Sequence, residues 1–234
     1  MLIQDLPSPN FDARNVGVDI LLLHYTGMKT AQDAIDRLRD AAAQVSAHYV
    51  VDEDGTTYRL VAEEMRAWHA GTSYWAGARD INARSIGIEI VNPGHEFGYR
   101  AFPAVQMQAV LGLAKDIVAR HAIKPAWVIG HSDVAPIRKE DPGELFDWAM
   151  LAAEGVGLWP KPKPCGWSDA EFLIHLGRYG YDLEGPSGTD VGKARRAAIT
   201  AFTRHFRPGK LTDEPDSELK AVLNGLIDLA ASQA

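Results

Sequence analysis

Three short aliphatic runs constrain the fold of this chain more than any other feature of its sequence. Residues 18–23 (VDILLL), 85–91 (SIGIEIV) and 126–130 (AWVIG) show little alternation between apolar and polar positions. Such runs are typical of strands that are covered on both faces. Helical spacing in residues 30–44 and in the segment that Pro103 opens supplies helices between them. The sequence therefore predicts an α/β fold, a central mixed β-sheet flanked by helices.

A change of composition near residue 157 divides the chain. Residues 158–167 (LWPKPKPCGW) contain three prolines, which is typical of a stiff, extended connector. Beyond it, three segments have the spacing of amphipathic helices, at residues 168–177, 190–206 and 217–229. We predict a main domain over residues 1–157, a proline-rich linker over 158–167 and a small C-terminal three-helix module over 168–234.

One further local pattern predicts a hairpin. In residues 48–61 (HYVVDEDGTTYRLV), two β-prone runs flank a turn centred on Asp54-Gly55. This arrangement is a strong short-range signal for two antiparallel strands.

Composition excludes several classes of function. The chain carries 31 acidic and 24 Lys and Arg residues, a net charge of −7, which argues against a nucleic-acid partner. Its single cysteine, Cys165, excludes an internal disulfide and a multi-cysteine zinc site. The longest apolar run is far shorter than the roughly 20 residues of a transmembrane helix. Residues 1–15 have neither the basic start nor the apolar stretch of a secretory signal, which favours a cytoplasmic location.

Polar residues lie at or near the ends of the three aliphatic runs. His24 ends the first, Glu89 lies within the second, and His131 directly follows the third, with Lys139 and Asp141 shortly after it. Two histidines and one carboxylate form a sensible catalytic zinc set, because they leave a fourth coordination position for water. A carboxylate ligand also suits hydrolytic rather than structural zinc.

Each of these residues also has a purely structural interpretation. A histidine at a strand end can be a hydrogen-bonded core residue, and Glu89 can form a buried salt bridge. Asp141 precedes Pro142 and can belong to a turn or cap a helix, and Lys139 can be a solvated surface lysine. Spacing therefore favours the zinc interpretation without establishing it.

Five strings of the chain resemble a known family, in the same order. LLLHYTGM, SAHYVVDEDGTTYRLV, AWHAG, NARSIGIEIVN and GHSDVAPIRKEDPG are similar to motifs of the zinc-dependent N-acetylmuramoyl-L-alanine amidases of the type 2 class. The resemblance covers roughly residues 15–155, and the class is related in fold to peptidoglycan recognition proteins. The C-terminal helices, with the string AAITAFTRHFRP, resemble the small peptidoglycan-binding module of two-domain members.

The resemblance implies a role for individual residues. His24, His131 and Asp141 match the ligands of one zinc ion per chain. Glu89 matches the catalytic glutamate, and Lys139 matches the lysine that assists at the reacting carbonyl. Four further residues in the matching strings are candidate substrate contacts: His48, Trp68, His69 and Asn92.

The implied reaction is zinc-dependent hydrolysis of the amide between the lactyl group of N-acetylmuramic acid and L-alanine of the stem peptide. A cytoplasmic location would make the substrate a 1,6-anhydro muropeptide met during cell-wall recycling. Two alternatives stay open: a non-catalytic muropeptide-binding protein and a lytic amidase that acts on intact peptidoglycan. Relatives that only bind commonly lack the ligand at the position of Asp141, so its presence favours an enzyme.

Two groups of side chains outside these motifs carry structural expectations. Trp75, Trp127 and Trp148 are expected to pack in or around the core. The basic residues of the C-terminal module are expected to form a solvated helix surface rather than a contact with anionic muropeptide: Arg195, Arg196, Arg204, His205 and Arg207.

Overall fold

A six-stranded mixed sheet forms the centre of the molecule in the computed structural model, which describes residues 2–233. Its strands are, in spatial order, β1 (Ile3–Asp5), β5 (Thr57–Arg59), β4 (Tyr49–Val51), β7 (Ser85–Ile90), β3 (Ile20–Tyr25) and β8 (Val128–Gly130). β4 and β5 pair antiparallel, whereas the other neighbours are parallel. The predicted mixed sheet and the predicted hairpin over residues 48–61 are therefore confirmed.

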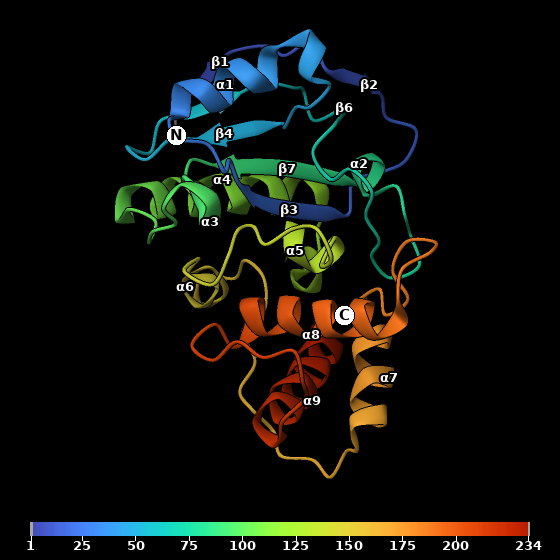
Figure 1. Ribbon diagram of the computed structural model, residues 1–234. Coiled ribbons are helices and arrows are strands. Elements are labelled where there is room, and N and C mark those ends of the chain that lie inside the picture. Colours follow the sequence, from blue (N-terminus) through green and yellow to red (C-terminus); the bar gives the residue numbers. More distant parts are fainter. Residues whose placement is uncertain (1, 234) are drawn as a thin grey trace.

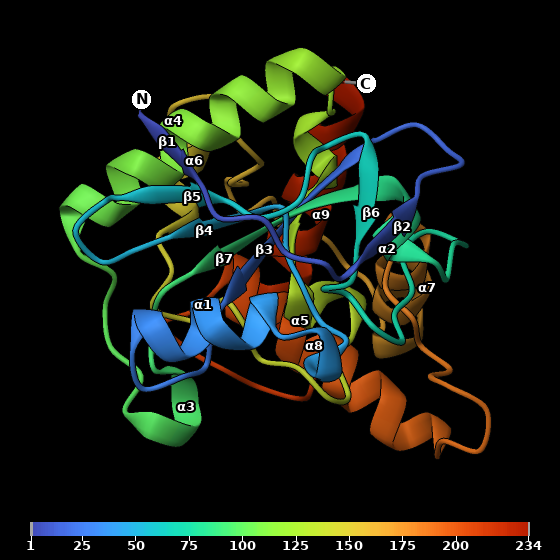
Figure 2. The ribbon, with the colours of Figure 1, turned by 90° about the horizontal axis from the view of Figure 1, so that it is seen from above.

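Helices cover both faces of this sheet. Figure 2 shows α4 (Ala104–His121) and α1 (Ala31–Arg39) on opposite sides of the strands. α1 begins after Thr30, whose side chain accepts a hydrogen bond from the Asp33 N–H, a standard N-cap. The helix ends earlier than the predicted residue 44, because Asp40 is extended and its carboxylate caps a separate short 3₁₀ turn, η1 (Ala41–Ala43).

Strand β3 shows why the aliphatic runs lack alternation. Ile20 and Leu22 belong to one hydrophobic cluster, whereas Leu21 and Leu23 belong to another on the opposite face of the sheet. Both faces of the strand are covered, as its sequence predicts.

Several short elements connect the main ones. A two-stranded antiparallel sheet joins β2 (Phe11–Ala13) to β6 (Met65–Ala67). The short helices are α2 (Ile81–Arg84), α3 (Gly94–Phe97), η2 (Pro125–Trp127), α5 (His131–Val134) and α6 (Trp148–Ala153). Among the described residues, no helix combines the length and apolar character needed to cross a bilayer.

The three predicted C-terminal helices are present as α7 (Asp169–Tyr179), α8 (Val191–Phe206) and α9 (Ser217–Ser232). Each begins after a residue whose side chain accepts a hydrogen bond from the first turn: Ser168, Asp190 and Asp216. In Figure 1 these helices, coloured orange to red, lie below α5.

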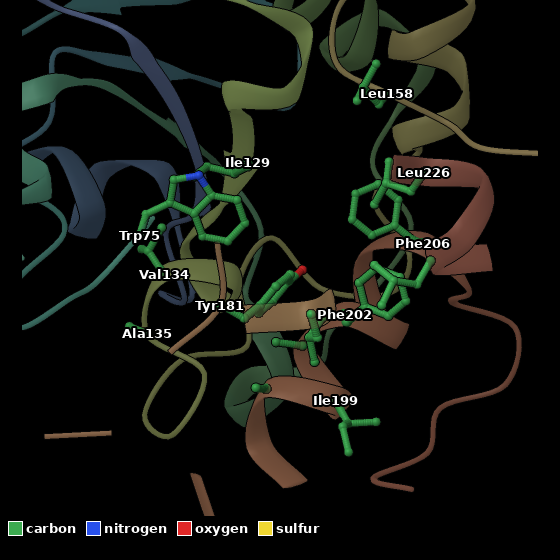
Figure 3. Close-up of a cluster of buried hydrophobic side chains, with 14 of the residues drawn as sticks. Trp75, Ile129, Val134, Ala135, Leu158, Tyr181, Ile199, Phe202, Phe206 and Leu226 are labelled. Atoms are coloured by element: carbon green, nitrogen blue, oxygen red, sulfur yellow. The ribbon is translucent and has the colours of Figure 1, made fainter. Parts of the chain in front are cut away.

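These helices share a hydrophobic cluster with the sheet. Figure 3 shows Trp75 and Ile129 of the N-terminal part in the same cluster as Tyr181, Phe202 and Leu226. The cluster also includes Ile20 and Leu22 of β3. The division into residues 1–157, 158–167 and 168–234 stays a prediction, since a shared core neither requires nor excludes it.

The expected solvated basic surface on the C-terminal module is wrong for three of its five residues. Arg204, His205 and Arg207 are only 7%, 2% and 8% exposed, because α8 turns them toward acidic groups of the protein. Arg195 and Arg196 are exposed as expected. Trp75 and Trp148 are buried, and Trp127 is partly buried against the core, as predicted.

Candidate active site

Three side chains meet at the carboxyl ends of the parallel strands. His24 lies near the end of β3, His131 begins α5 directly after β8, and Asp141 lies in the loop that follows α5. The Nδ1 atoms of the two histidines are 2.9 Å apart, and Oδ2 of Asp141 lies 3.1 Å from His24 Nδ1 and 3.0 Å from His131 Nδ1. All three residues are buried.

These three atoms fit a zinc ion. Ligand atoms on a tetrahedral zinc, each 2.0–2.2 Å from the metal, lie about 3.3–3.6 Å from one another, and the separations here are within about 0.5 Å of that. Among the described residues, these three side chains form a group of histidine and carboxylate ligands that could hold a metal ion. Three protein ligands leave a fourth position for water or substrate.

The hydrogen bonds of the two histidines direct lone pairs to this point. His131 Nε2 lies 3.0 Å from the carbonyl oxygen of Ala70, so it must carry the proton that it donates, and Nδ1 keeps its lone pair. His24 Nε2 donates in the same way to Nδ1 of His69 at 3.1 Å, and Nε2 of His69 faces Oγ of Ser85 at 3.4 Å. Partners of this kind fix the tautomer and the ring orientation of metal ligands.

The charge states also suit a metal. Burial, followed by the nearby His131, lowers the pKa of His24 to about 4, so the ring is neutral at pH 7. Burial alone would raise the pKa of Asp141, but the two histidines that contact it hold its pKa well below the usual range. Neutral imidazoles and an ionised carboxylate are the forms that bind metal.

A glycine in β7 makes room for His69. An added Cβ at Gly87 would lie 2.6 Å from the His69 ring, closer than any real contact. The small residue in SIGIEI therefore allows His69 to lie against the strand and accept from His24.

Glu89 and Lys139 share a cleft with two of the three candidate ligands, His131 and Asp141. Glu89 of β7 lies opposite His24 in the register of the parallel pair. Its Oε2 is buried and has no hydrogen-bond partner among residues 2–233. Burial, and next the charge of Asp141, raises the pKa of Glu89 to about 8. A carboxylate with an unused acceptor in such a place is suited to take a proton from a water molecule.

His131, Asp141, Glu89 and Lys139 line one cleft. Trp68, His69 and one side of α1 also line this cleft.

Comparison with known proteins agrees with this geometry. The profile of the N-acetylmuramoyl-L-alanine amidase family matches residues 14–144. This chain belongs to that family. The amidase is 38% identical to N-acetylmuramoyl-L-alanine amidase AmiD of Escherichia coli K12, over 90% of this chain and 83% of AmiD. It is 35% identical to 1,6-anhydro-N-acetylmuramyl-L-alanine amidase AmpD of Citrobacter freundii, over 63% of this chain and 87% of AmpD.

Solved structures extend the likeness to the whole amidase. The complex of E. coli AmiD with the substrate anhydro-N-acetylmuramic acid-L-Ala-D-γ-Glu-L-Lys superposes with a TM-score of 0.81 at 36% identity, covering 95% of this chain and 94% of that one. AmpDh3 of Pseudomonas aeruginosa has a TM-score of 0.80 at 32% identity, covering 92% and 94%. The predicted family, enzyme class and fold are thus confirmed.

Two of the four candidate substrate contacts do not line the cleft of the amidase. His48 is fully buried, and its Nδ1 accepts from the Gly87 N–H at 2.9 Å while its Nε2 donates to the Met65 carbonyl oxygen at 3.1 Å. Asn92 is also buried, and its amide bonds the main chain of Arg100 and Gly94. Both side chains hold loops of the amidase in place, which corrects the expectation of direct substrate contact. Trp68 and His69 do line the cleft.

The sequence interpretation also missed residues that line the cleft of the amidase. Tyr25 follows His24 at the end of β3, and Arg37 lies on α1 beside Ala34 and Leu38. A signal exists for Arg37: it lies one turn of helix after Ala34 and next to Leu38, which are both buried on α1.

Proposed function

We propose that this chain hydrolyses the amide between the lactyl group of anhydro-N-acetylmuramic acid and L-alanine of the stem peptide, in the recycling of cell-wall fragments. The observation that carries the proposal is the convergence of His24, His131 and Asp141 on one point, with Glu89 and Lys139 lining the same cleft as His131 and Asp141. The anhydro form of the substrate is supported by the AmiD complex, whose chain this one covers almost completely.

In this proposal one zinc is held by His24, His131 and Asp141. Bound there, zinc would lower the pKa of water to about 7 and polarise the scissile carbonyl. The residues of the chain supply the proton chemistry. Glu89 accepts a proton from the attacking water while the water oxygen bonds to the carbonyl carbon. Glu89 then delivers that proton to the leaving nitrogen as the C–N bond breaks.

Lys139 is assigned to the charge that develops on the carbonyl oxygen. Lys139 lines the same cleft as Glu89, His131 and Asp141. A preorganised positive group of this kind stabilises a transition state more than the neutral substrate.

The decisive experiment is a mass-spectrometric assay of Glu89→Gln on a purified anhydromuropeptide. We expect the variant to keep its zinc and to lose about 10²–10⁴-fold in turnover, the usual contribution of a general acid–base group. Glu96→Gln is a matched control, because Glu96 is exposed on α3 and does not line the cleft. Normal turnover by the Glu89 variant would reduce Glu89 to a structural residue of β7.

The same assay separates the alternative functions. Intact sacculi are tested in parallel with the soluble fragment. Release of peptides from sacculi alone would favour a lytic amidase, and binding without products would favour a muropeptide-binding protein. The cytoplasmic location stays a prediction.

A further inference from the structure

A buried carboxylate lies two residues after the metal ligand His131. Asp133 of α5 is fully buried, and its Oδ2 accepts a hydrogen bond from the Gly130 N–H at 2.7 Å. This bond closes the turn where β8 becomes α5, and that turn carries His131. A charge so deeply buried is tolerated only when its remaining acceptor sites are also satisfied.

The C-terminal helices supply those missing partners. The hydroxyl of Tyr181, in the connection after α7, donates to Oδ1 of Asp133 at 2.6 Å. The Nδ1 of His205, near the end of α8, donates to Oδ2 at 2.7 Å. Both side chains are buried, and Figure 3 shows Tyr181 within the hydrophobic cluster that joins the two parts of the chain.

Aromatic packing fixes the orientation of the His205 ring. It stacks on Trp148 of α6 with ring centroids 3.8 Å apart and on its neighbour Phe206 at the same distance. Its other nitrogen, Nε2, has no hydrogen-bond partner within residues 2–233. The ring is therefore held in one position, and Asp133 is its polar contact there.

Arg204, the residue before His205 on α8, contacts the loop that carries Asp141. Arg204 pairs with Glu140 at 3.3 Å and with Glu144 at 3.2 Å, on both sides of Asp141. The Arg204 side chain is only 8% exposed, whereas Glu144 is 24% and Glu140 51% exposed, so water screens the pair with Glu144 less than the pair with Glu140. The carbonyl oxygen of Asp141 in turn accepts from the Ser132 N–H at 2.8 Å, which links the two segments directly.

We infer that Tyr181, Arg204 and His205 are positioning residues of the metal site, through which the C-terminal helices hold His131 and Asp141 at the separation that zinc requires. The inference rests on the zinc site of the proposed function. None of the three lines the cleft, so they act through Asp133, Glu140 and Glu144 rather than on the substrate. Groups behind metal ligands typically contribute about 10–100-fold in metal affinity.

A solved AmpD structure is shorter than this chain. The solved AmpD structure covers 64% of this chain and 93% of its own. In this chain, however, removal of Tyr181 and His205 would leave Asp133 buried with one partner. The site of this protein therefore depends on helices that lie outside the family match.

The inference is tested by zinc affinity, without substrate. Tyr181→Phe and His205→Leu are titrated with zinc against a chromophoric chelator, and the visible absorption of the cobalt-substituted proteins reports ligand geometry. We expect a zinc Kd about 10–100-fold weaker and a changed cobalt spectrum. His205→Asn should recover part of the affinity, because an amide N–H can replace Nδ1–H toward Asp133.

Thr203→Val is the matched control. Thr203 is buried on the same helix, but its hydroxyl bonds the carbonyl oxygens of Thr200 and Thr212, away from the metal site. It should lower the melting temperature with unchanged zinc affinity. Wild-type affinity and cobalt spectrum in Tyr181→Phe, which removes one oxygen atom, would overturn the inference even if His205→Leu fails to fold. Failure of the proposed function appears separately, as wild-type protein that does not bind zinc or does not cut the muropeptide.

Discussion

At the scale of single residues, the candidate site depends on side chains and main-chain groups that orient the two histidine rings. His24 and His131 can present lone pairs to one point because His69 and the Ala70 carbonyl accept their other ring protons. His69 in turn reaches His24 because Gly87 leaves space beside β7. Because these contacts are connected in series, a small displacement of one residue shifts the candidate ligand atoms.

Gly87→Ala is predicted to disturb the contacts that link Gly87, His69 and His24. The new methyl group would overlap the His69 ring, so overpacking should cost about 1–3 kcal/mol of unfolding free energy. Zinc affinity should fall with it, because His69 loses its place behind His24. Denaturant unfolding and zinc titration measure both effects, with Gly112→Ala on α4 as the control, where a Cβ meets nothing within 4 Å. An unchanged zinc affinity in the Gly87 variant would exclude this role of His69.

Lys139→Met is predicted to act on the transition state. We expect kcat to fall about 10²–10³-fold with KM nearly unchanged, because the developing negative charge loses its positive partner. Steady-state kinetics on a soluble anhydromuropeptide measure the two parameters. Lys124→Met, an exposed lysine that lies outside the cleft, is the matched control. A rise in KM at constant kcat would instead assign Lys139 to substrate binding.

At the scale of elements, one carboxylate ties the loop before β6 to the sheet and to α4. Glu63 accepts hydrogen bonds from Tyr49 of β4 at 2.7 Å and from Arg120 and His121 of α4, each at 2.6 Å. Burial alone would raise the pKa of Glu63, but these hydrogen bonds lower it to about 2. The folded protein therefore favours the ionised form more than the unfolded chain does.

This difference predicts a pH-dependent effect of Glu63→Gln. Since the folded pKa lies below the unfolded value of about 4.3, the stabilisation is complete above that pH and is lost as the pH falls toward about 2. We expect the variant to be about 1–2 kcal/mol less stable than wild type at pH 7, with a smaller gap at pH 3. Denaturant unfolding at both pH values measures the gap. A gap that is constant with pH would mean that the charge of Glu63 contributes nothing.

At the scale of the whole molecule, the C-terminal helices complete the core rather than extend from it. Phe172, Phe202 and Leu226 pack in the cluster that also contains Ile20 and Leu22 of the central sheet. His205 and Arg204 add polar contacts from the same helices to the segments that carry two of the candidate metal ligands. Loss of the helices would therefore affect both the core and the site.

Truncation after residue 157 is predicted to inactivate the enzyme on small soluble substrates. It would expose Ile20, Leu22 and Trp75, which are buried in the shared cluster, and such a patch promotes aggregation. Size-exclusion chromatography, zinc content and hydrolysis of soluble anhydromuropeptide measure the outcome. A truncated protein that is monomeric, zinc-loaded and fully active would instead establish the predicted boundary as that of two independent domains.

The sequence alone determined the elements whose pattern is local. The aliphatic runs predicted β3, β7 and β8, the spacing of apolar residues predicted α4 and the three C-terminal helices, and the turn at Asp54-Gly55 predicted the hairpin. The candidate ligands, Glu89 and Lys139 were recognised because they lie in or after such runs and in strings that resemble a family.

Tertiary structure alone decided which side chains meet across long stretches of chain. The sequence predicts His205 to be one of several basic residues on a helix surface, but it contacts Asp133, 72 positions earlier. The resemblance implies that His48 and Asn92 are substrate contacts, but main-chain groups use their polar atoms. Periodicity shows that one face of a helix or strand is covered, but it does not show what covers it. The role of a polar residue depends on that partner, because only a satisfied hydrogen bond or ion pair offsets the cost of burying it.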